Sequence, residues 1–331
     1  MPRTQFISTG FHVPERIVTN DELRTWWDTS DEWIRARTGI GERHWVEPGL
    51  EAGSDLALKA AQSALERADL KATDLDCIVF ATLSPDYFFP GGGVFLQRKL
   101  GVPGIPALDI RNQCSGFLYG LSVADAWVRS GQYKRVLLIG AEVHSTGMDF
   151  SPGGRDLSVL FGDGAGAVIL GPGDDGRGVL SVHLHADGVG AEQLWCESES
   201  SARMPRISYD DLDAGRHFAR MNGREVFRNA VVRMPEVVRE GLAANDLTAE
   251  DIDLFIPHQA NLRISEAVQK QLGLRDDQVY NNIERFGNTT AATLPIAMDE
   301  VARSGRLKEG DLLVLSAFGS GWTWGSAIIR W

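Results

Sequence analysis

Short runs of apolar residues alternate with longer stretches of mixed polarity along most of the chain. The runs 77–81 and 136–139 are apolar without interruption and are bounded by polar turns, which is typical of strands buried on both faces of a sheet. From Phe117 onward, apolar residues recur with helical spacing. Strands that alternate with helices indicate βαβ units, so the pattern predicts an α/β protein with mainly parallel sheets.

The pattern occurs twice, at an offset of about half the chain. The matching pairs are 65–81 with 242–258, 128–139 with 302–315, and 161–169 with 318–329. The first two pairs repeat a succession of helix, turn and strand, and the third repeats a glycine-rich turn followed by a strand, which indicates an internal duplication. We therefore expect two similar halves, residues 1–173 and 174–331, that face each other across a pseudo-twofold axis. Clefts at such junctions are common ligand sites.

The repeat also relates three residues with chemically useful side chains. Arg129 and Arg303 occupy matched positions, and Cys114 precedes Arg129 by as many residues as Asn288 precedes Arg303. We therefore expect Cys114 and Asn288 at the start of the corresponding helix in opposite halves. His258 ends one of the repeated strands. The duplication thus predicts that Cys114, Asn288 and His258 meet at the interface between the halves.

Composition narrows the class of protein. The chain has 331 residues, 43% of them hydrophobic, and a formal net charge of −12. This apolar share is ordinary for a globular protein, whereas the acidic balance argues against nucleic-acid binding. No run approaches the roughly 18 apolar residues of a membrane span, and the first residues lack the apolar core of a secretory signal. We expect a cytoplasmic protein without a membrane span.

The three cysteines have different surroundings. Cys77, Cys114 and Cys196 form no CxxC pair and no metal-ligand spacing, so we expect free thiols and no metal site. Cys77 lies within an apolar run and fits a small buried hydrophobe, and Cys196 lies among polar residues without an activating context. Cys114 opens a predicted helix, whose positive end favours the thiolate. This makes Cys114 a candidate nucleophile.

His258 and Asn288 are candidate catalytic residues only in combination with Cys114. A lone histidine that closes an apolar strand is usually a hydrogen-bonded core residue, and a lone asparagine before a helix is usually an N-cap. The set of cysteine, histidine and asparagine fits a hydrolase of the papain type. It also fits a thioester enzyme in which two neutral donors stabilise a developing enolate. The duplicated setting of His258 and Asn288 favours the thioester enzyme.

With these motifs in place, the sequence resembles the β-ketoacyl-acyl carrier protein synthase III family, which belongs to the thiolase superfamily of condensing enzymes. The resemblance covers essentially the whole chain. Its motifs, in the family's order, are 28–40, 114–117, 160–167, 258–263, 287–292 and 318–325. It implies a thiolase-like fold, in which duplicated βαβαβ halves form a layered α-β-α-β-α arrangement.

The resemblance implies a ping-pong transferase of fatty acid biosynthesis. An acyl-CoA would acylate Cys114, and malonyl-acyl carrier protein would then bind. Its decarboxylation would give an enolate, held by His258 and Asn288, that attacks the Cys114 thioester. The backbone N–H groups of Cys114 and Ser320 would form the oxyanion hole. Coenzyme A enters only as the thioester substrate, and no other cofactor is implied.

The same motif matching implies contacts with coenzyme A. Trp33 and Arg155 would flank the adenine, Arg37 would approach the phosphates, and Asn261 would approach the pantetheine arm. The planar fork of arginine suits phosphate recognition. The alternative for Trp33 is core packing, which its acidic surroundings disfavour; these surroundings indicate a loop.

Contacts with other proteins are implied as well. Arg228, Arg263 and Lys270 would form a basic patch for the acidic carrier protein, although solvated surface charges are the simpler explanation. Members of the family form homodimers, in which Phe89 would reach the acyl pocket of the partner subunit. The aromatic loop 87–90 could equally pack in the core.

Three departures from the family pattern leave the substrate open. Residues 111–113 replace small residues before the nucleophile, Ser320 replaces a glycine and thereby loses backbone freedom, and the segment 189–216 is longer than usual. The acyl chain length, the acceptor, the role of this segment, and primary versus specialised metabolism therefore stay undetermined. One alternative is an acyltransferase of a specialised pathway that passes the acyl group from Cys114 to another nucleophile.

Two further alternatives are disfavoured. A degradative thiolase normally uses a second cysteine near the C-terminus, and the last cysteine here is Cys196. A catalytically silent partner subunit would have lost its nucleophile, and Cys114 is intact.

Overall fold

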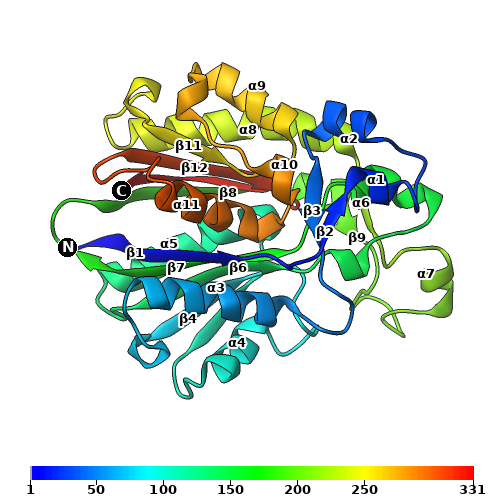
Figure 1. Ribbon diagram of the computed structural model, residues 1–331, viewed down its shortest axis with the longest axis horizontal. Coiled ribbons are helices and arrows are strands. Elements are labelled where there is room, and N and C mark those ends of the chain that lie inside the picture. The colour runs from blue at the N-terminus through cyan, green and yellow to red at the C-terminus, as the bar shows by residue number, and fades with distance from the viewer. Residues whose placement is uncertain (1) are drawn as a thin grey trace.

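Two stacked β-sheets dominate the computed structural model, which describes residues 2–331 (Figure 1). The strands of the first sheet are, in order, β1 (Arg3–His12), β7 (Gly164–Gly173), β6 (Val136–Glu142), β4 (Cys77–Ala81) and β5 (Ala107–Ile110). The strands of the second sheet are, in order, β11 (Leu254–Pro257), β12 (Leu312–Gly319), β13 (Thr323–Arg330) and β8 (Gly178–Ala186).

Both sheets are mixed, so the prediction of mainly parallel sheets is wrong in part. Strand β4 runs parallel to β5 and β6, and β11 runs parallel to β12. The remaining pairs, β1–β7, β6–β7, β12–β13 and β13–β8, are antiparallel. Parallel neighbours need a crossover helix between them, whereas β12 and β13 are joined by a tight turn that reverses the chain.

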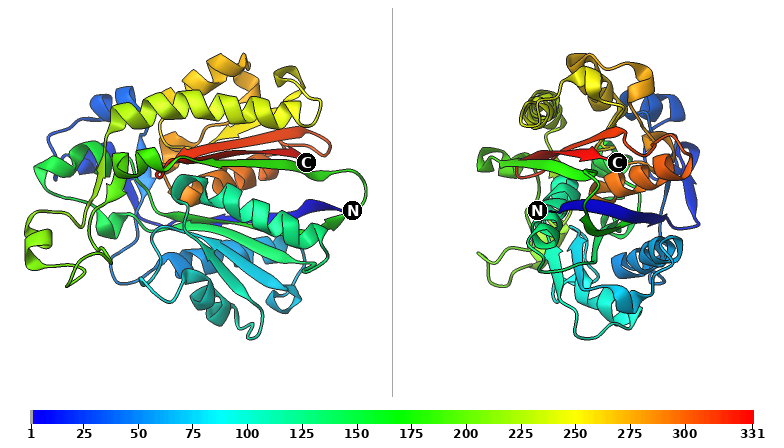
Figure 2. Two further views of the ribbon diagram at one scale, coloured as in Figure 1. Left: turned by 180° about the vertical axis from the view of Figure 1, so that it is seen from behind. Right: turned by 90° about the vertical axis from the view of Figure 1, so that its left-hand side faces the viewer.

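The helices form three layers around the two sheets. Helices α5 (Gly116–Arg129) and α11 (Thr293–Arg303) lie between the sheets. Helices α3 (Gly53–Arg67) and α4 (Gly92–Leu100) cover the outer face of the first sheet, and α8 (Gly223–Ala243) and α9 (Leu262–Leu272) lie outside the second (Figure 2). This arrangement confirms the predicted duplicated α-β-α-β-α fold.

The two halves share one hydrophobic core. Leu118 of α5 and Leu294 of α11 are fully buried, as are Leu138 of β6 and Leu315 of β12, and all four belong to the same cluster. Both sheets therefore bury an apolar face against the same pair of helices. The connection from Gly173 to Gly178 joins the sheets, and the domain boundary expected between residues 173 and 174 stays a prediction.

The shorter elements gather mostly at the end of the molecule away from the two termini (Figure 1). They are β2 (Ile17–Thr19), α1 (Asn20–Leu23), α2 (Asp31–Thr38), β3 (Glu42–His44), α6 (Arg155–Ser158), β9 (Leu194–Cys196), α7 (Tyr209–Asp213), β10 (Ala219–Met221) and α10 (Ile283–Phe286). Trp33 lies on α2, so its assignment to a loop is wrong. Ser30 caps this helix by accepting a hydrogen bond from the Trp33 N–H, and Gly39 ends it with φ 80°.

Strand β5 forms an outer edge of the first sheet, because no strand within residues 2–331 pairs with its second side. Exposed apolar side chains surround this edge: Leu108 on the strand itself, and Tyr87, Phe88 and Phe89 in the loop before α4. Phe89 is 79% exposed, so the alternative that it packs in the core is wrong. Within the described residues, none of the helices combines the length and the apolar character that a membrane span requires.

Candidate active site

Each central helix is preceded by a single turn of 3₁₀ helix. These turns are η2 (Gln113–Ser115) before α5 and η8 (Thr290–Ala292) before α11. The first residue of each turn adopts a left-handed backbone, with φ 44° at Gln113 and 48° at Thr290. The local geometry therefore matches Gln113 with Thr290, and Cys114 with Ala291.

The predicted equivalence of Cys114 and Asn288 is therefore wrong by three residues. Helix α5 has 14 residues and α11 has 11, so counting back from Arg129 and Arg303 misplaces the helix start by about one turn. Asn288 precedes η8 instead of lying within it. The turns η2 and η8 nevertheless contact each other, which brings both halves to one interface.

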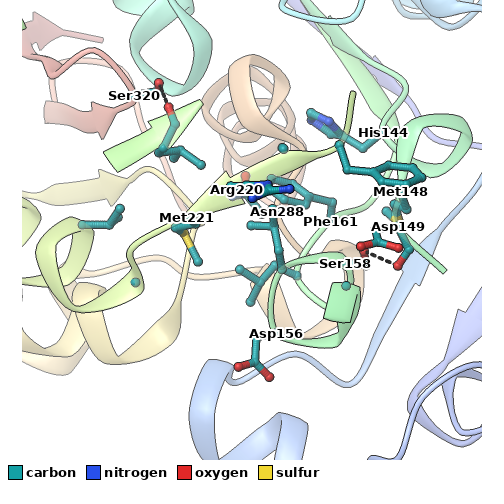
Figure 3. A pocket seen from close by; sticks show the side chains of 18 of the residues that line it. His144, Met148, Asp149, Asp156, Ser158, Phe161, Arg220, Met221, Asn288 and Ser320 are labelled. Atoms are coloured by element: carbon teal, nitrogen blue, oxygen red, sulfur yellow. Dashed lines mark hydrogen bonds between the residues drawn. The ribbon is translucent and has the colours of Figure 1, made fainter. Parts of the chain in front are cut away.

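A cavity of about 1580 Å³ lies at this interface. Cys114, His258 and Asn288 all line it, so the structure brings the three predicted residues into one space. Figure 3 shows Asn288 among the lining side chains, with His144 and Phe161 nearby. No group of three or more histidine, cysteine, aspartate or glutamate side chains in the described part of the chain is arranged to hold a metal ion.

Cys114 is a buried thiol, 8% exposed. Burial raises the pKa of this thiol to about 12, and the nearby Glu142 carboxyl acts in the same direction. Hydrogen bonds from the backbone N–H groups of Cys114 and Ser320 oppose the shift without cancelling it. The expectation that the helix end makes Cys114 a thiolate is therefore wrong, and the group is a thiol near neutral pH.

Ser320 contributes its backbone N–H beside the Cys114 sulfur. Its hydroxyl donates a hydrogen bond to the carbonyl oxygen of Leu194, which ties the turn between β12 and β13 to β9. The left-handed conformation in this turn falls on Gly321, with φ 133°, and not on Ser320. A serine at position 320 therefore needs none of the backbone freedom that glycine provides.

His258 follows β11 directly and is 3% exposed. Its Nδ1 atom lies 2.7 Å from the Thr293 hydroxyl, whereas its Nε2 atom has no hydrogen-bond partner among residues 2–331. Burial lowers the pKa of His258 to about 3, so the ring is neutral near pH 7. The sequence analysis missed Thr293, although a hydroxyl residue on the buried face right after the motif 287–292 was a usable signal.

The amide of Asn288 is oriented by the backbone. Its Oδ1 atom accepts a hydrogen bond of 2.8 Å from the N–H of Thr290, and its own N–H donates to the carbonyl oxygen of Leu160. This leaves the two N–H bonds of Nδ2 without a partner among residues 2–331, on a side chain that lines the cavity. Asn288 can thus donate hydrogen bonds to a group bound there.

Glu142 is a buried carboxyl at the end of β6 that the sequence analysis also missed. Its oxygens accept hydrogen bonds from the hydroxyls of Thr82 and Ser84 and from the backbone N–H groups of Leu83, Ser84 and Ala291. Burial raises the pKa of Glu142 to about 7 despite these bonds. The carboxyl thereby links the end of β4 to η8. In the sequence, only the position of this acidic residue at the end of an apolar run could have indicated its role.

The predicted coenzyme A residues line the same cavity. Two guanidinium groups lie over the Trp33 ring, with the Cζ atom of Arg37 at 4.3 Å and that of Arg155 at 4.6 Å from the ring centre. Asn261 also lines the cavity, but its amide is already used by the protein. Its Nδ2 donates to the carbonyl oxygen of Arg37, and its Oδ1 caps α9 by accepting from the N–H of Arg263.

The residues predicted to contact other proteins lie in different places relative to the cavity. Arg263 lines the cavity, whereas Arg228 and Lys270 lie outside it on the adjacent helices α8 and α9. Arg228 is exposed and pairs with Glu225 at 2.6 Å. Phe89 does not line the cavity of its own chain.

The long segment 189–216 contributes one wall of the cavity through Trp195 and Cys196 of β9. Ion pairs hold the segment together, among them that of Arg203 with Asp211 at 2.7 Å. Cys196 is exposed, and its thiol donates to the backbone carbonyl groups of Ser198 within the segment and of His217 just after it. The segment therefore helps to shape the space around the site.

Comparisons with known proteins agree on one family. Residues 108–188 match the family model described as 3-oxoacyl-[acyl-carrier-protein] synthase III, and residues 242–331 match its C-terminal counterpart. The chain is 47% identical over 328 residues to a β-ketoacyl-[acyl-carrier-protein] synthase III of Xanthomonas campestris, with 99% of this chain and 98% of that one covered.

Solved structures give the same result. A 3-oxoacyl-[acyl-carrier-protein] synthase III from Aquifex aeolicus superposes with a TM-score of 0.90 at 40% identity, covering 99% of this chain and 100% of that one. The priming β-ketosynthase of the R1128 polyketide pathway superposes with a TM-score of 0.91 at 33% identity, covering 99% and 96%. The fold is therefore shared by synthases of more than one pathway.

Proposed function

Because the chain belongs to the 3-oxoacyl-[acyl-carrier-protein] synthase III family of condensing enzymes, we propose that it joins the acyl group of an acyl-CoA to malonyl-acyl carrier protein. The product is a β-ketoacyl thioester, and the reaction belongs to fatty acid biosynthesis. The observation on which the proposal depends is the shared cavity, which Cys114, His258 and Asn288 line together.

In the first half-reaction, the Cys114 sulfur attacks the thioester carbon of the acyl-CoA. The negative charge that develops on the thioester oxygen needs hydrogen-bond donors. The backbone N–H groups of Cys114 and Ser320 support this role, because both lower the pKa of the thiol and so favour negative charge beside it. Coenzyme A leaves, and the acyl group stays on Cys114 as a thioester.

In the second half-reaction, malonyl-acyl carrier protein takes the place of coenzyme A. Loss of carbon dioxide leaves an enolate, which attacks the acyl-Cys114 thioester and releases the sulfur. The unpartnered Nδ2 of Asn288 supports its role as a donor to the enolate oxygen, and the buried ring of His258 supplies the second contact. Donors held in place by the protein stabilise such a charge more than mobile water does.

Recognition of the two substrates uses different surfaces. Trp33 and Arg155 flank the adenine of coenzyme A, for which the Arg155 guanidinium group now over the Trp33 ring moves aside, and the planar fork of Arg37 suits the phosphates. The carrier protein, which is acidic in this family, binds at Arg228, Arg263 and Lys270 on α8 and α9. Asn261 approaches the pantetheine arm from the start of α9, the helix that its side chain caps.

The assembly is a homodimer, as in the family. The exposed aromatic side chain of Phe89 supports its insertion into the acyl pocket of the partner subunit. The protein works in the cytoplasm and needs no cofactor beyond the coenzyme A thioester it consumes.

Intact-mass spectrometry tests this function. Incubation with a panel of acyl-CoAs should add one acyl group, which Cys114→Ala abolishes and Cys196→Ser retains, since Cys196 is the other cysteine that lines the cavity. Malonyl-acyl carrier protein should then discharge the adduct with release of carbon dioxide. Absence of any adduct on Cys114 would refute the proposal. Discharge by a hydroxyl or amine acceptor alone would establish the acyltransferase of a specialised pathway instead.

A further inference from the structure

Thr293 and His258 form a buried pair that the proposed reaction does not explain. Nδ1 of His258 lies 2.7 Å from the hydroxyl oxygen of Thr293, the first residue of α11. Both side chains are almost inaccessible, with 2% exposure for Thr293 and 3% for His258. The contact between Nδ1 and the hydroxyl is therefore shielded from water, and a hydrogen bond there fixes the position of a proton more firmly than in water.

The direction of the hydrogen bond follows from the third member of the network. The Thr293 hydroxyl lies 3.0 Å from the carbonyl oxygen of Thr290, to which it can only donate. A hydroxyl has a single proton, so while Thr293 donates to that carbonyl it can only accept from Nδ1 of His258. The neutral ring then has its proton on Nδ1. Its Nε2 atom presents a lone pair, and the structure gives this atom no protein partner among residues 2–331.

We infer that Thr293 is a positioning residue, which holds the resting His258 ring in the tautomer protonated on Nδ1 and so makes Nε2 the base for the Cys114 thiol. The inference rests on the proposed function. As Sγ of Cys114 attacks the thioester carbon, its proton passes to Nε2. As the bond from that carbon to the coenzyme A sulfur breaks, the proton passes on to that sulfur. Coenzyme A leaves as a thiol and His258 is neutral again.

Cys114 needs such a base because of its own surroundings. Burial raises the pKa of its thiol to about 12, so the group is protonated near neutral pH, whereas the thiolate is the nucleophile. The pKa of His258, about 3, disfavours a lasting imidazolium. Proton transfer therefore accompanies the attack of the sulfur instead of preceding it, and a general base in such a step contributes roughly 10²–10⁴-fold in rate.

The same hydroxyl also serves the second half-reaction. The enolate oxygen requires an Nε2–H group, and Nδ1 is buried against Thr293, so only Nε2 can exchange a proton with the cavity. Nε2 takes a proton from water that enters after coenzyme A has left, while Nδ1–H continues to donate to the Thr293 hydroxyl. The ring is then cationic only while the enolate is anionic, and it returns the proton to water once the enolate has attacked the thioester.

Nuclear magnetic resonance of the full-length protein labelled with ¹⁵N-histidine tests the tautomer directly. His258 is assigned by its absence in the His258→Gln variant. The expected result is a protonated Nδ1 and an unprotonated Nε2 in the resting protein, kept in Thr293→Ser and lost in Thr293→Val. A resting ring protonated on Nε2 overturns the inference, as does a Thr293→Val protein with an unchanged tautomer.

Acylation rates provide the second readout. Thr293→Val, which keeps the shape and removes the hydroxyl, should slow the formation of acyl-Cys114 by about 10²-fold, while Thr293→Ser should stay within a few-fold of the parent. Thr293→Ala replaces the valine variant if that protein does not fold. An unchanged rate in the folded variant overturns the inference. If the parent protein forms no adduct with any acyl-CoA, the proposed function fails, and the tautomer measurement still decides the role of Thr293.

Discussion

Gly319 lies directly against Cys114: a Cβ atom built on Gly319 would be 2.9 Å from the Cβ atom of Cys114 and 3.1 Å from its backbone nitrogen. The atoms it would meet belong to the rigid turn η2 and cannot swing away. Gly319→Ala should therefore displace the nucleophile by a few tenths of an ångström and slow its acylation by roughly tenfold or more, since misplacement of reacting groups is costly. The rate of adduct formation by mass spectrometry measures the effect.

Gly188→Ala is the matched control for this variant. A Cβ atom there would meet nothing within 4 Å, and the residue lies outside the cavity lining. It should acylate at the parent rate. Equal rates in both alanine variants would contradict the tight fit between Gly319 and Cys114.

Because the pKa of Glu142 is raised, we expect the free energy of unfolding to depend on pH in a specific way. Burial raises the pKa of this carboxyl from 4.5 to about 7, so between these pH values the folded state binds the proton and the unfolded state has lost it. The stabilising contribution of the protonated form is complete below the unfolded pKa and is lost as the pH rises through the folded pKa. The free energy of unfolding of the parent protein, relative to Glu142→Gln, should therefore fall by a few kcal/mol as the pH rises from about 4.5 to about 7.

Urea unfolding of the parent and of Glu142→Gln across this range measures the difference. The variant should also be less stable overall by roughly 1–3 kcal/mol, because the amide N–H₂ brings two donor hydrogens, where the protonated carboxyl brings one, into a site lined by other donors. A difference between the two proteins that does not change with pH would show that Glu142 titrates normally.

Asn288→Asp should separate the two half-reactions. The aspartate keeps an oxygen for the Thr290 N–H but replaces the Nδ2 donor by a second oxygen, which repels an enolate. Removing one such donor typically costs about 10²–10³-fold in rate. Release of carbon dioxide from malonyl-acyl carrier protein should fall by this factor, while acylation of Cys114 changes only a few-fold. Equal losses in both steps would count against this role of Asn288.

Arg155→Ala should weaken the binding of acyl-CoA. The guanidinium group lies 4.6 Å from the centre of the Trp33 ring, and we expect it to stack in the same way on the adenine, where such a contact adds about 0.5–2 kcal/mol. KM for the acyl-CoA should rise by several-fold to about 30-fold with little change in kcat. Arg233 lies 5.1 Å from the ring of Trp324 outside the cavity, so Arg233→Ala should leave KM unchanged.

Charge reversal on α8 and α9 should affect only the second substrate. Arg228→Glu combined with Lys270→Glu should raise KM for the malonyl-acyl carrier protein, and the effect should shrink at high salt because exposed charges are screened. Acylation by acyl-CoA should not change. Lys134→Glu is the matched control, since Lys134 is also exposed but precedes β6 in the other half. If Lys134→Glu is equally damaging, the patch on α8 and α9 has no special role.

The sequence predicted which side chains meet better than it predicted their register. The duplication was sufficient to bring Cys114, His258 and Asn288 to one interface, because matched strands and helices must pack in matched ways. It misplaced Asn288 relative to Cys114, because α11 is one turn shorter than α5 and the lost turn lies at the helix start. A length difference inside a helical pattern leaves no mark in the periodicity of apolar residues.

The electrostatics of the site depended on burial, which no local pattern reports. The helix end at Cys114 favoured a thiolate in isolation, but desolvation and the Glu142 carboxyl outweigh it in the folded protein. Thr293 and Glu142 act through contacts between segments far apart in the sequence or between helix and strand ends. Such contacts exist only once the chain has folded.

The unpaired side of β5 links the association of this protein with other chains to the position of its nucleophile. This strand ends at Ile110, four residues before the nucleophile, so any chain that adds to its open edge also restrains the backbone leading to Cys114. Binding that favours one arrangement of this backbone lowers the population of all others by mass action. The concentration of the protein itself then becomes a variable of the reaction, and dilution below the dissociation constant should lower the activity per molecule before any part of the fold is lost.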